Sequence, residues 1–231
     1  MSNFSVILMT AAASGEGQHA GGAFVKVDER ACLLRSVELF LNRQNVTQIL
    51  LVVEPERLDE ARHKFGAHLS FSGVKLVGGG PLWLDQVAAA GLKVSDAATH
   101  VVLHDAARPI VPFSDVDALL DAAERHEVVG LSTPVRATLI ETDGGGRPVA
   151  YHPGHRFAQL QTPQCFSRAR FDEMARTKQE VHAPAVHLLP GSPLNVRVDG
   201  SADAANAKTF LNLLPKPKKN PLTNPFEEAQ W

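Results

Sequence analysis

Short apolar runs alternate with amphipathic stretches along the first half of the chain. The runs at 6–9, 49–53, 74–77 and 101–105 are bounded by turn residues, a pattern typical of strands buried on both faces. The stretches between and after them predict helices at about 30–40, 55–63, 82–93 and 114–124, the last capped by Ser114-Asp115. This alternation predicts an α/β fold: a doubly wound, mostly parallel, Rossmann-like sheet.

The pattern changes in the second half. After a strand at 128–138, residues 139–142, 143–146 and 148–151 read as strand, turn and strand, which predicts a β-hairpin arm at about 138–156. An arm too small to be a domain suits contact with a partner, so we expect a homodimer through the hairpin arm. The remaining expectations are a short edge strand at 24–27, a core segment at 161–166, a helix at 168–178, an irregular segment at 180–193, a last strand at 194–199 and a helix at 201–213 capped by Ser201.

Composition narrows the class of protein. With 231 residues and 44% hydrophobic content, the chain can bury one core, which we place at 1–214 with a mobile tail at 215–231. The net charge of −2 gives no electrostatic footprint for nucleic acid. Two distant cysteines, Cys32 and Cys165, and the lack of a signal peptide or membrane span predict a cytoplasmic protein.

The candidate chemistry begins where the strand at 101–105 ends. His104-Asp105-Ala106-Ala107-Arg108-Pro109 follows three apolar residues, and parallel strand ends are where α/β proteins bind ligands. Asp105 can bind a cation, and Arg108 can form a bidentate contact with a phosphate. The two alanines allow a ligand to approach the backbone closely. A plain Asp–Arg pair that closes the junction explains the same residues, and both interpretations stay open.

A second candidate is the loop after the first strand. Residues 10–22 are mostly small residues and glycines, which can bring backbone N–H groups up to phosphates or a base. The spacing is neither Gly-x-Gly-x-x-Gly nor a Walker A sequence, so a plain flexible connection is an equal alternative.

Several segments together resemble one family. They are the Ala-Ala loop at 11–13, Val-Leu-His-Asp-Ala-Ala-Arg-Pro at 102–109, Pro-Val-Arg-Ala-Thr at 134–138, Gln-Thr-Pro-Gln-Cys-Phe at 161–166 and Asn-Val-Arg-Val-Asp at 195–199. In this order, over about residues 5–211, the chain resembles the 2-C-methyl-D-erythritol 4-phosphate cytidylyltransferases of isoprenoid precursor biosynthesis.

The resemblance implies a nucleotidyltransferase fold and a reaction. A methylerythritol phosphate oxygen attacks the α-phosphorus of CTP, Mg²⁺ holds the triphosphate, and pyrophosphate leaves. The implied nucleotide-binding residues are Ala11, Ala12, Ala13, Ser14, Gly15, Gly78, Gly79, Gln86 and Ala106. The implied residues for the phosphorylated polyol are Asp105, Arg108, Thr138, Arg156, Thr162 and Arg197, with Asp105 also as metal ligand and Lys26 and Arg197 as catalytic cations.

The nucleotide half departs from the family pattern. Residues 11–23 contain no Arg or Lys, whereas the family has an Arg and then a Pro-Lys that lie on the triphosphate. Gly21-Gly22 falls at the Pro-Lys site, and Lys26 substitutes only if the loop is re-registered, since its alternation with valines favours an outward side chain. Trp83 stands where the family has an Arg, Gln86 where it has a Ser, and Arg197 where it has a Lys. Residues 182–185 replace a Thr-Asp-rich segment of the family. The family's arm Arg aligns nearest to Gly154, so Arg156 takes its place only if the alignment shifts by a small number of residues.

Two functions fit this pattern. The first is a cytidylyltransferase with a rebuilt triphosphate site. The second is a non-catalytic or altered-specificity paralogue that binds a phosphorylated ligand or a protein partner. Each fixed positive charge on a transferring phosphoryl group contributes about 10²–10³ in rate. The first function therefore requires that another group replace the missing loop cations, whereas the second does not.

Overall fold

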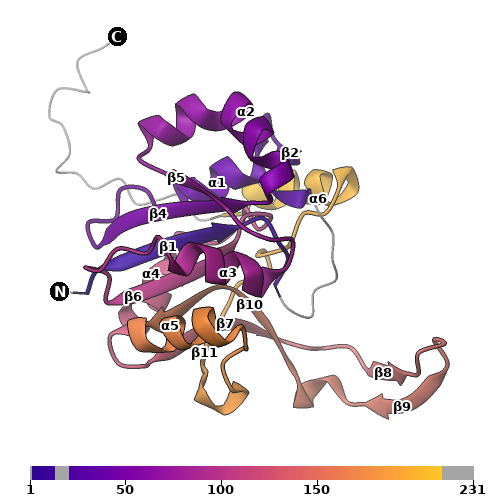
Figure 1. The fold of residues 1–231 in the computed structure, drawn as a ribbon. Coiled ribbons are helices and arrows are strands. Elements are labelled where there is room, and N and C mark those ends of the chain that lie inside the picture. Colours follow the sequence, from indigo (N-terminus) through magenta and orange to yellow (C-terminus); the bar gives the residue numbers. More distant parts are fainter. Residues whose placement is uncertain (1, 14–20, 215–231) are drawn as a thin grey trace, which may run out of the picture.

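One sheet organises the described part of the chain, residues 2–13 and 21–214 of the computed structural model. Its seven strands follow the order β11 (His187–Pro190), β7 (Val128–Pro134), β10 (Ala158–Ser167), β6 (His100–Asp105), β1 (Phe4–Met9), β4 (Val46–Val53) and β5 (Lys75–Gly78) (Figure 1). Strand β10 runs antiparallel to β6 and β7, and the other pairs in this sheet are parallel. The prediction of a mostly parallel α/β sheet is confirmed.

Helices cover both faces of the sheet. The α-helices are α1 (Cys32–Glu38), α2 (Leu58–Phe71), α3 (Trp83–Gly91), α4 (Phe113–Ala123), α5 (Arg168–Thr177) and α6 (Ser201–Leu211). Short 3-10 turns are η1 (Gly22–Phe24), η2 (Pro55–Arg57), η3 (Gly154–Arg156) and η4 (Ala183–Ala185). Two small hairpins complete the fold: β2 (Lys26–Val27) with β3 (Arg30–Ala31), and β8 (Leu139–Thr142) with β9 (Pro148–His152).

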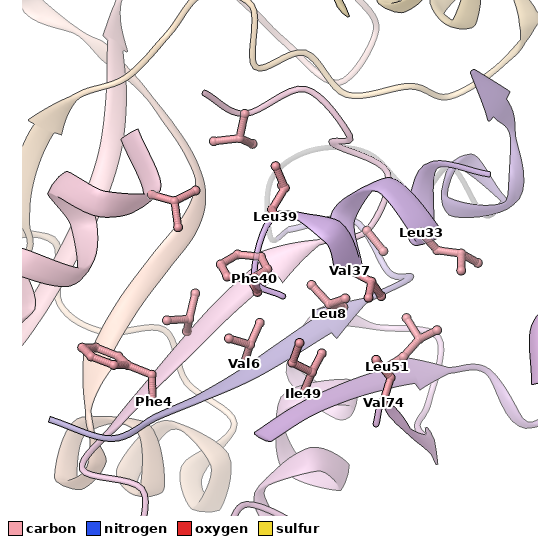
Figure 2. Close-up of a cluster of buried hydrophobic side chains, with 14 of the residues drawn as sticks. Phe4, Val6, Leu8, Leu33, Val37, Leu39, Phe40, Ile49, Leu51 and Val74 are labelled. Carbon is pink, nitrogen blue, oxygen red and sulfur yellow. The ribbon is translucent and has the colours of Figure 1, made fainter. Parts of the chain in front are cut away.

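Strand alternation divides the core into two layers. Val6 and Leu8 of β1 pack in one cluster with side chains of α1, α2 and α4, part of which Figure 2 shows. Ile7 and Met9 point to the other face and pack with α3 and α5. Because a strand's side chains alternate in direction, one continuous apolar run can serve both layers. A third, smaller cluster joins α6 to Val27 of β2.

The predicted arm is present as the β8–β9 hairpin. It projects away from the body of the protein, at the lower right of Figure 1. The strand before it, β7, ends at Pro134 rather than at residue 138. Within the described residues, no helix has the length and apolar character needed to cross a membrane.

The predicted last strand at 194–199 is wrong. Its backbone bonds instead to the loop after β6: Val198 N–H donates to the Ala107 carbonyl, and the Asn195 carbonyl accepts from Arg108. The strand that completes the sheet is β11, which lies in the segment expected to be irregular. The backbone of 194–199 thus bonds to the Arg108 side chain and to the loop after β6 instead of to a strand. Apolar periodicity does not reveal such partners.

Other boundaries also differ from the expectations. The helix expected at 55–63 runs as α2 to Phe71, after the turn η2. The expected edge strand at 24–27 is only the two residues of β2 and pairs outside the main sheet. Neither Ser114 nor Ser201 is an N-cap, because those positions are Pro112 and Gly200. The expected tail at 215–231 lies outside the described residues.

Candidate functional site

The ends of three strands meet at one edge of the sheet. Met9, the last residue of β1, pairs with Asp105, the last of β6, and Ala106 N–H donates to the Met9 carbonyl at 2.8 Å. Beside them, Gly79 N–H donates to the carbonyl of Val53 at the end of β4 at 3.0 Å. The first loop, the Gly78-Gly79 turn and the His-Asp-Ala-Ala-Arg segment therefore start at the same edge, where parallel sheets bind ligands.

Asp105 lies at the centre of a buried charge cluster. One carboxylate oxygen accepts the Ala107 N–H at 2.8 Å, and the other accepts Arg197 Nε at 2.7 Å. Arg108 Nε lies 4.0 Å from that second oxygen, and Arg197 also pairs with Asp199. Burial raises the pKa of Asp105, while Arg197, the Ala107 N–H and Arg108 act in the opposite direction. Two guanidinium groups, those of Arg108 and Arg197, and two carboxylates, those of Asp105 and Asp199, therefore lie together in this cluster.

A hydrogen-bond chain connects this cluster to β10. The Asp105 N–H donates to Thr162 Oγ1 at 3.1 Å, and the Thr162 carbonyl accepts Asn195 Nδ2 at 2.7 Å. The Asn195 carbonyl in turn accepts Arg108 Nη1 at 2.9 Å. Asp105, Arg108, Thr162 and Arg197, all predicted from the sequence as residues for the phosphorylated polyol, are thus brought together.

Asn195 is a site residue that the sequence reasoning missed. Its side chain and carbonyl both belong to the network, and only 2% of its surface is exposed. The available signal was its place in the same short motif as Arg197. Gly22 is a second missed residue: a Cβ there would lie 2.1 Å from the Val198 carbonyl oxygen, so a glycine is needed where η1 meets the 194–199 segment.

His104 has a structural part in the cluster. It is fully buried, and its Nε2 lies 3.1 Å from the Arg108 carbonyl, to which the N–H form donates. Burial lowers the pKa of His104 to about 3, so the imidazole is neutral at physiological pH. It therefore fixes the carbonyl of Arg108 and adds no charge to the site.

The side of the site predicted to bind the nucleotide contains Gln86 and the first residues of the loop after β1, residues 10–13. Gln86 is buried in α3, and its Oε1 accepts the N–H groups of Thr10 and Ala11 at 3.0 and 3.2 Å. Ala11 is buried and Ala13 lines a cavity, while Ser14 and Gly15 lie outside the described residues. Gly79 is required by packing, because a Cβ there would lie 2.5 Å from Val52 Cγ1.

The cavity beside the loop is largely apolar. Its volume is about 340 Å³, and its lining includes Ala13, Trp83, Thr162, Phe166 and Val186. Trp83 is 5% exposed and belongs to the apolar layer under α3. The residue that replaces the family's Arg therefore supplies an apolar wall at this place and no charge.

Three predicted residues lie away from the buried cluster. Lys26 is exposed on β2, between half-buried Val25 and buried Val27, as its alternation indicated. Thr138 and Arg156 are exposed at the two ends of the arm. None of the three has a hydrogen bond or ion pair to Asp105 or Arg197 among the described residues. Their roles stay predictions.

At the arm position aligned with the family's Arg, a side chain would displace the neighbouring backbone. Gly154 is buried, and a Cβ there would lie 2.1 Å from the Ala137 carbonyl oxygen and 2.7 Å from that of Val135. A guanidinium at this point of the arm has to come from a neighbouring position, and Arg156 is the exposed cation in the same turn.

Asp105 does not fit as a direct ligand of Mg²⁺. Both of its oxygens accept hydrogen bonds, and the carboxylate is fully buried beside two guanidinium groups. Mg²⁺ demands an octahedral set of oxygens and keeps several waters. Within the residues that the structure describes, no group of three or more His, Cys, Asp or Glu side chains is arranged to hold a metal ion.

Comparisons with known proteins identify the family of this chain. A cytidylyltransferase from Frankia casuarinae is 30% identical over 214 residues, covering 86% of this chain and 79% of its own, and one from Rhodopirellula baltica is 28% identical over 232 residues, covering 89% and 94%. Both are named 2-C-methyl-D-erythritol 4-phosphate cytidylyltransferase. The crystal structure of 4-diphosphocytidyl-2C-methyl-D-erythritol synthase from Anaerococcus prevotii matches with a TM-score of 0.72 at 17% identity, covering 91% of this chain and 96% of that one, which shows the shared fold. The family model for 2-C-methyl-D-erythritol 4-phosphate cytidylyltransferase matches residues 5–213, and the chain belongs to this family.

Proposed function

We propose that this chain transfers a cytidylyl group from CTP to 2-C-methyl-D-erythritol 4-phosphate. A phosphate oxygen of the acceptor forms a bond to the α-phosphorus of CTP, and the bond from that phosphorus to the bridging oxygen breaks as pyrophosphate leaves. The observation that carries the proposal is the buried pair Arg108 and Arg197 around Asp105. Such a displacement depends on positioning and on fixed positive charge rather than on covalent chemistry by the protein.

We assign the residues at this edge of the sheet to two groups, one for the acceptor phosphate and one for the nucleotide. Arg108 and Arg197, held by Asp105 and the Asn195 carbonyl, present fixed positive charge to the acceptor phosphate. Ala11, Ala12, Ala13 and the Gly78-Gly79 turn are the small residues that allow the nucleotide close to the backbone. A Mg²⁺ ion would be held by oxygens of the triphosphate, since Asp105 does not fit as its ligand. The free, buried Cys32 and Cys165 suit a reducing compartment such as the cytoplasm.

The arm supports the proposal of a homodimer. Its exposed apolar side chains include Tyr151 at 74%, Val149 at 61% and Ile140 at 50% exposed. A row of this kind on a projecting hairpin marks a surface for a protein partner. A second copy would place Thr138 and Arg156 of one arm toward the partner's site. Sedimentation of the native protein and of the Tyr151→Asp variant tests this, with a dimer expected for the first and a monomer for the second.

One observation favours a second function. The first loop contains no cation at 11–23, and Lys26 is exposed on β2. A protein that keeps the acceptor cluster and lacks charge on the triphosphate would bind a phosphorylated ligand without turnover. Titration with CTP and with methylerythritol phosphate, alongside pyrophosphate release, separates the two functions: acceptor binding without pyrophosphate release supports the second.

A further inference from the structure

Gln86 connects three strand ends through one side chain. Its Oε1 accepts the N–H groups of Thr10 and Ala11, at 3.0 and 3.2 Å, and its Nε2 donates to Thr10 Oγ1 at 3.2 Å. Thr10 Oγ1 in turn donates to the Val52 carbonyl at 3.1 Å. Gln86 is completely buried, so every one of these bonds is shielded from water.

The same residue also contacts the Gly-Gly turn. The position that a Cβ of Gly79 would take lies 3.1 Å from both Cα and Cγ of Gln86. The Gly79 N–H donates to the Val53 carbonyl. Gln86 is therefore packed between the turn after β5 and the start of the loop after β1, and a shift of its side chain would affect both.

Gln86 cannot reach a nucleotide while it holds these bonds. The side chain is completely buried, its oxygen accepts two loop N–H groups, and one of its two amide N–H groups donates to Thr10 Oγ1. The Ala11 N–H depends on this oxygen, whereas the Thr10 N–H also lies 3.3 Å from the Val52 carbonyl. Backbone N–H groups in such loops are the usual donors to phosphates and bases. At Thr10 and Ala11 they are already used within the fold.

We infer that Gln86 is a positioning residue of the nucleotide site: it sets the course of the chain from Thr10 into the loop and does not bind the nucleotide itself. This rests on the proposed cytidylyl transfer. It replaces the expectation that Gln86 contacts CTP. A long carboxamide at this place, where the family has a Ser, holds the backbone of Thr10 and Ala11 from inside the fold.

The test compares Gln86→Met, which keeps the length and loses the polar atoms, with Gln86→Glu, which keeps an acceptor for the two N–H groups. Gln48→Met is the matched control. Gln48 bridges Ser5, Ser95 and Lys93 by three hydrogen bonds near the opposite ends of the strands. Amide hydrogen exchange at Thr10 and Ala11 is measured with the KM values for CTP and for methylerythritol phosphate.

For Gln86→Met we expect the exchange at Ala11 to accelerate by at least about tenfold, and that at Thr10 by less. The KM for CTP should rise about tenfold while the KM for methylerythritol phosphate stays unchanged. Gln86→Glu should restore part of the protection at Ala11, and Gln48→Met should change neither KM.

Two results would overturn the inference. Unchanged exchange at Ala11 in Gln86→Met would show that Gln86 does not hold the loop. A raised KM for CTP with unchanged exchange would instead make Gln86 a direct ligand contact. If the wild-type protein shows no turnover, the proposed transfer fails, but the exchange measurement still decides the role of Gln86.

Discussion

Arg197 is expected to contribute both to the stability of the protein and to its proposed activity. Its Nε lies 2.7 Å from the Asp105 carboxylate, and the two side chains are 7% and 0% exposed. Removing one partner of a buried ion pair costs about 3–5 kcal/mol, because the other charge stays buried without it. Asp105 keeps the Ala107 N–H and has Arg108 at 4.0 Å. For Arg197→Ala we therefore expect the lower end, about 3 kcal/mol of unfolding free energy.

The activity of the same variant should fall further than its stability explains. Removal of one fixed cation from a phosphoryl-transfer site lowers kcat by about 10²–10³. Arg197→Lys keeps the charge and loses the fork, so we expect it to keep most of kcat while losing part of the stability. Pyrophosphate release gives kcat, and urea unfolding gives the free energy under conditions where each variant is folded.

A matched control distinguishes the effect of removing a buried arginine from the effect of losing one positive charge. Arg62 pairs with Asp59 at 3.3 Å on the exposed face of α2. Arg62→Ala removes one positive charge and should leave both the urea midpoint and kcat unchanged. If Arg197→Ala unfolds at the wild-type urea concentration, or keeps wild-type kcat, the reasoning about the buried cluster is refuted.

Three further predictions concern the core and the arm. The pKa of His104 is lowered from 6.5 to about 3 by burial, so the unfolded chain takes up a proton that the folded chain excludes. The free energy of unfolding should therefore fall as the pH drops below 6.5, by up to about 1.4 kcal/mol per pH unit. In urea titrations from pH 7 to 4.5, His104→Gln should show a smaller pH dependence than the wild type. An equal pH dependence in the variant would assign the loss of stability to other groups. Burial raises the pKa of Cys32 to about 12 and also raises that of Cys165, so neither thiol should react with Ellman's reagent until urea unfolds the protein, and rapid native labelling would contradict their burial. Gly154→Ala places a Cβ 2.1 Å from a backbone oxygen and should cost about 1–3 kcal/mol in urea unfolding, whereas Gly144→Ala meets nothing within 4 Å and should cost little.

The sheet and two residues of the acceptor cluster, Asp105 and Arg108, were predictable because their signals are local. Apolar runs such as 101–105 identify buried strands, and the residues that follow such a strand lie at its carboxyl end. Asp105 and Arg108 follow from that rule alone. Bringing Thr162 and Arg197 to the same place required the family resemblance, since more than fifty residues separate each of them from Asp105.

What the sequence did not reveal depends on long-range competition for hydrogen bonds. Residues 194–199 read as a strand, but Arg108 and Ala107 take part of their backbone bonds, and β11 fills the sheet edge instead. Gln86 was predicted among the nucleotide-binding residues, and the sequence did not reveal that it hydrogen-bonds the N–H groups of Thr10 and Ala11. In both cases a buried polar side chain decided the local structure, and no periodicity of apolar residues reports such a partner.

The most direct test of the proposed reaction is pyrophosphate release by the purified protein with CTP, methylerythritol phosphate and Mg²⁺. If the proposed reaction takes place, release requires both substrates and falls by about 10²–10³ in Arg197→Ala. Methylerythritol phosphate binding to the folded wild-type protein, with no release of pyrophosphate at saturating CTP, would contradict it.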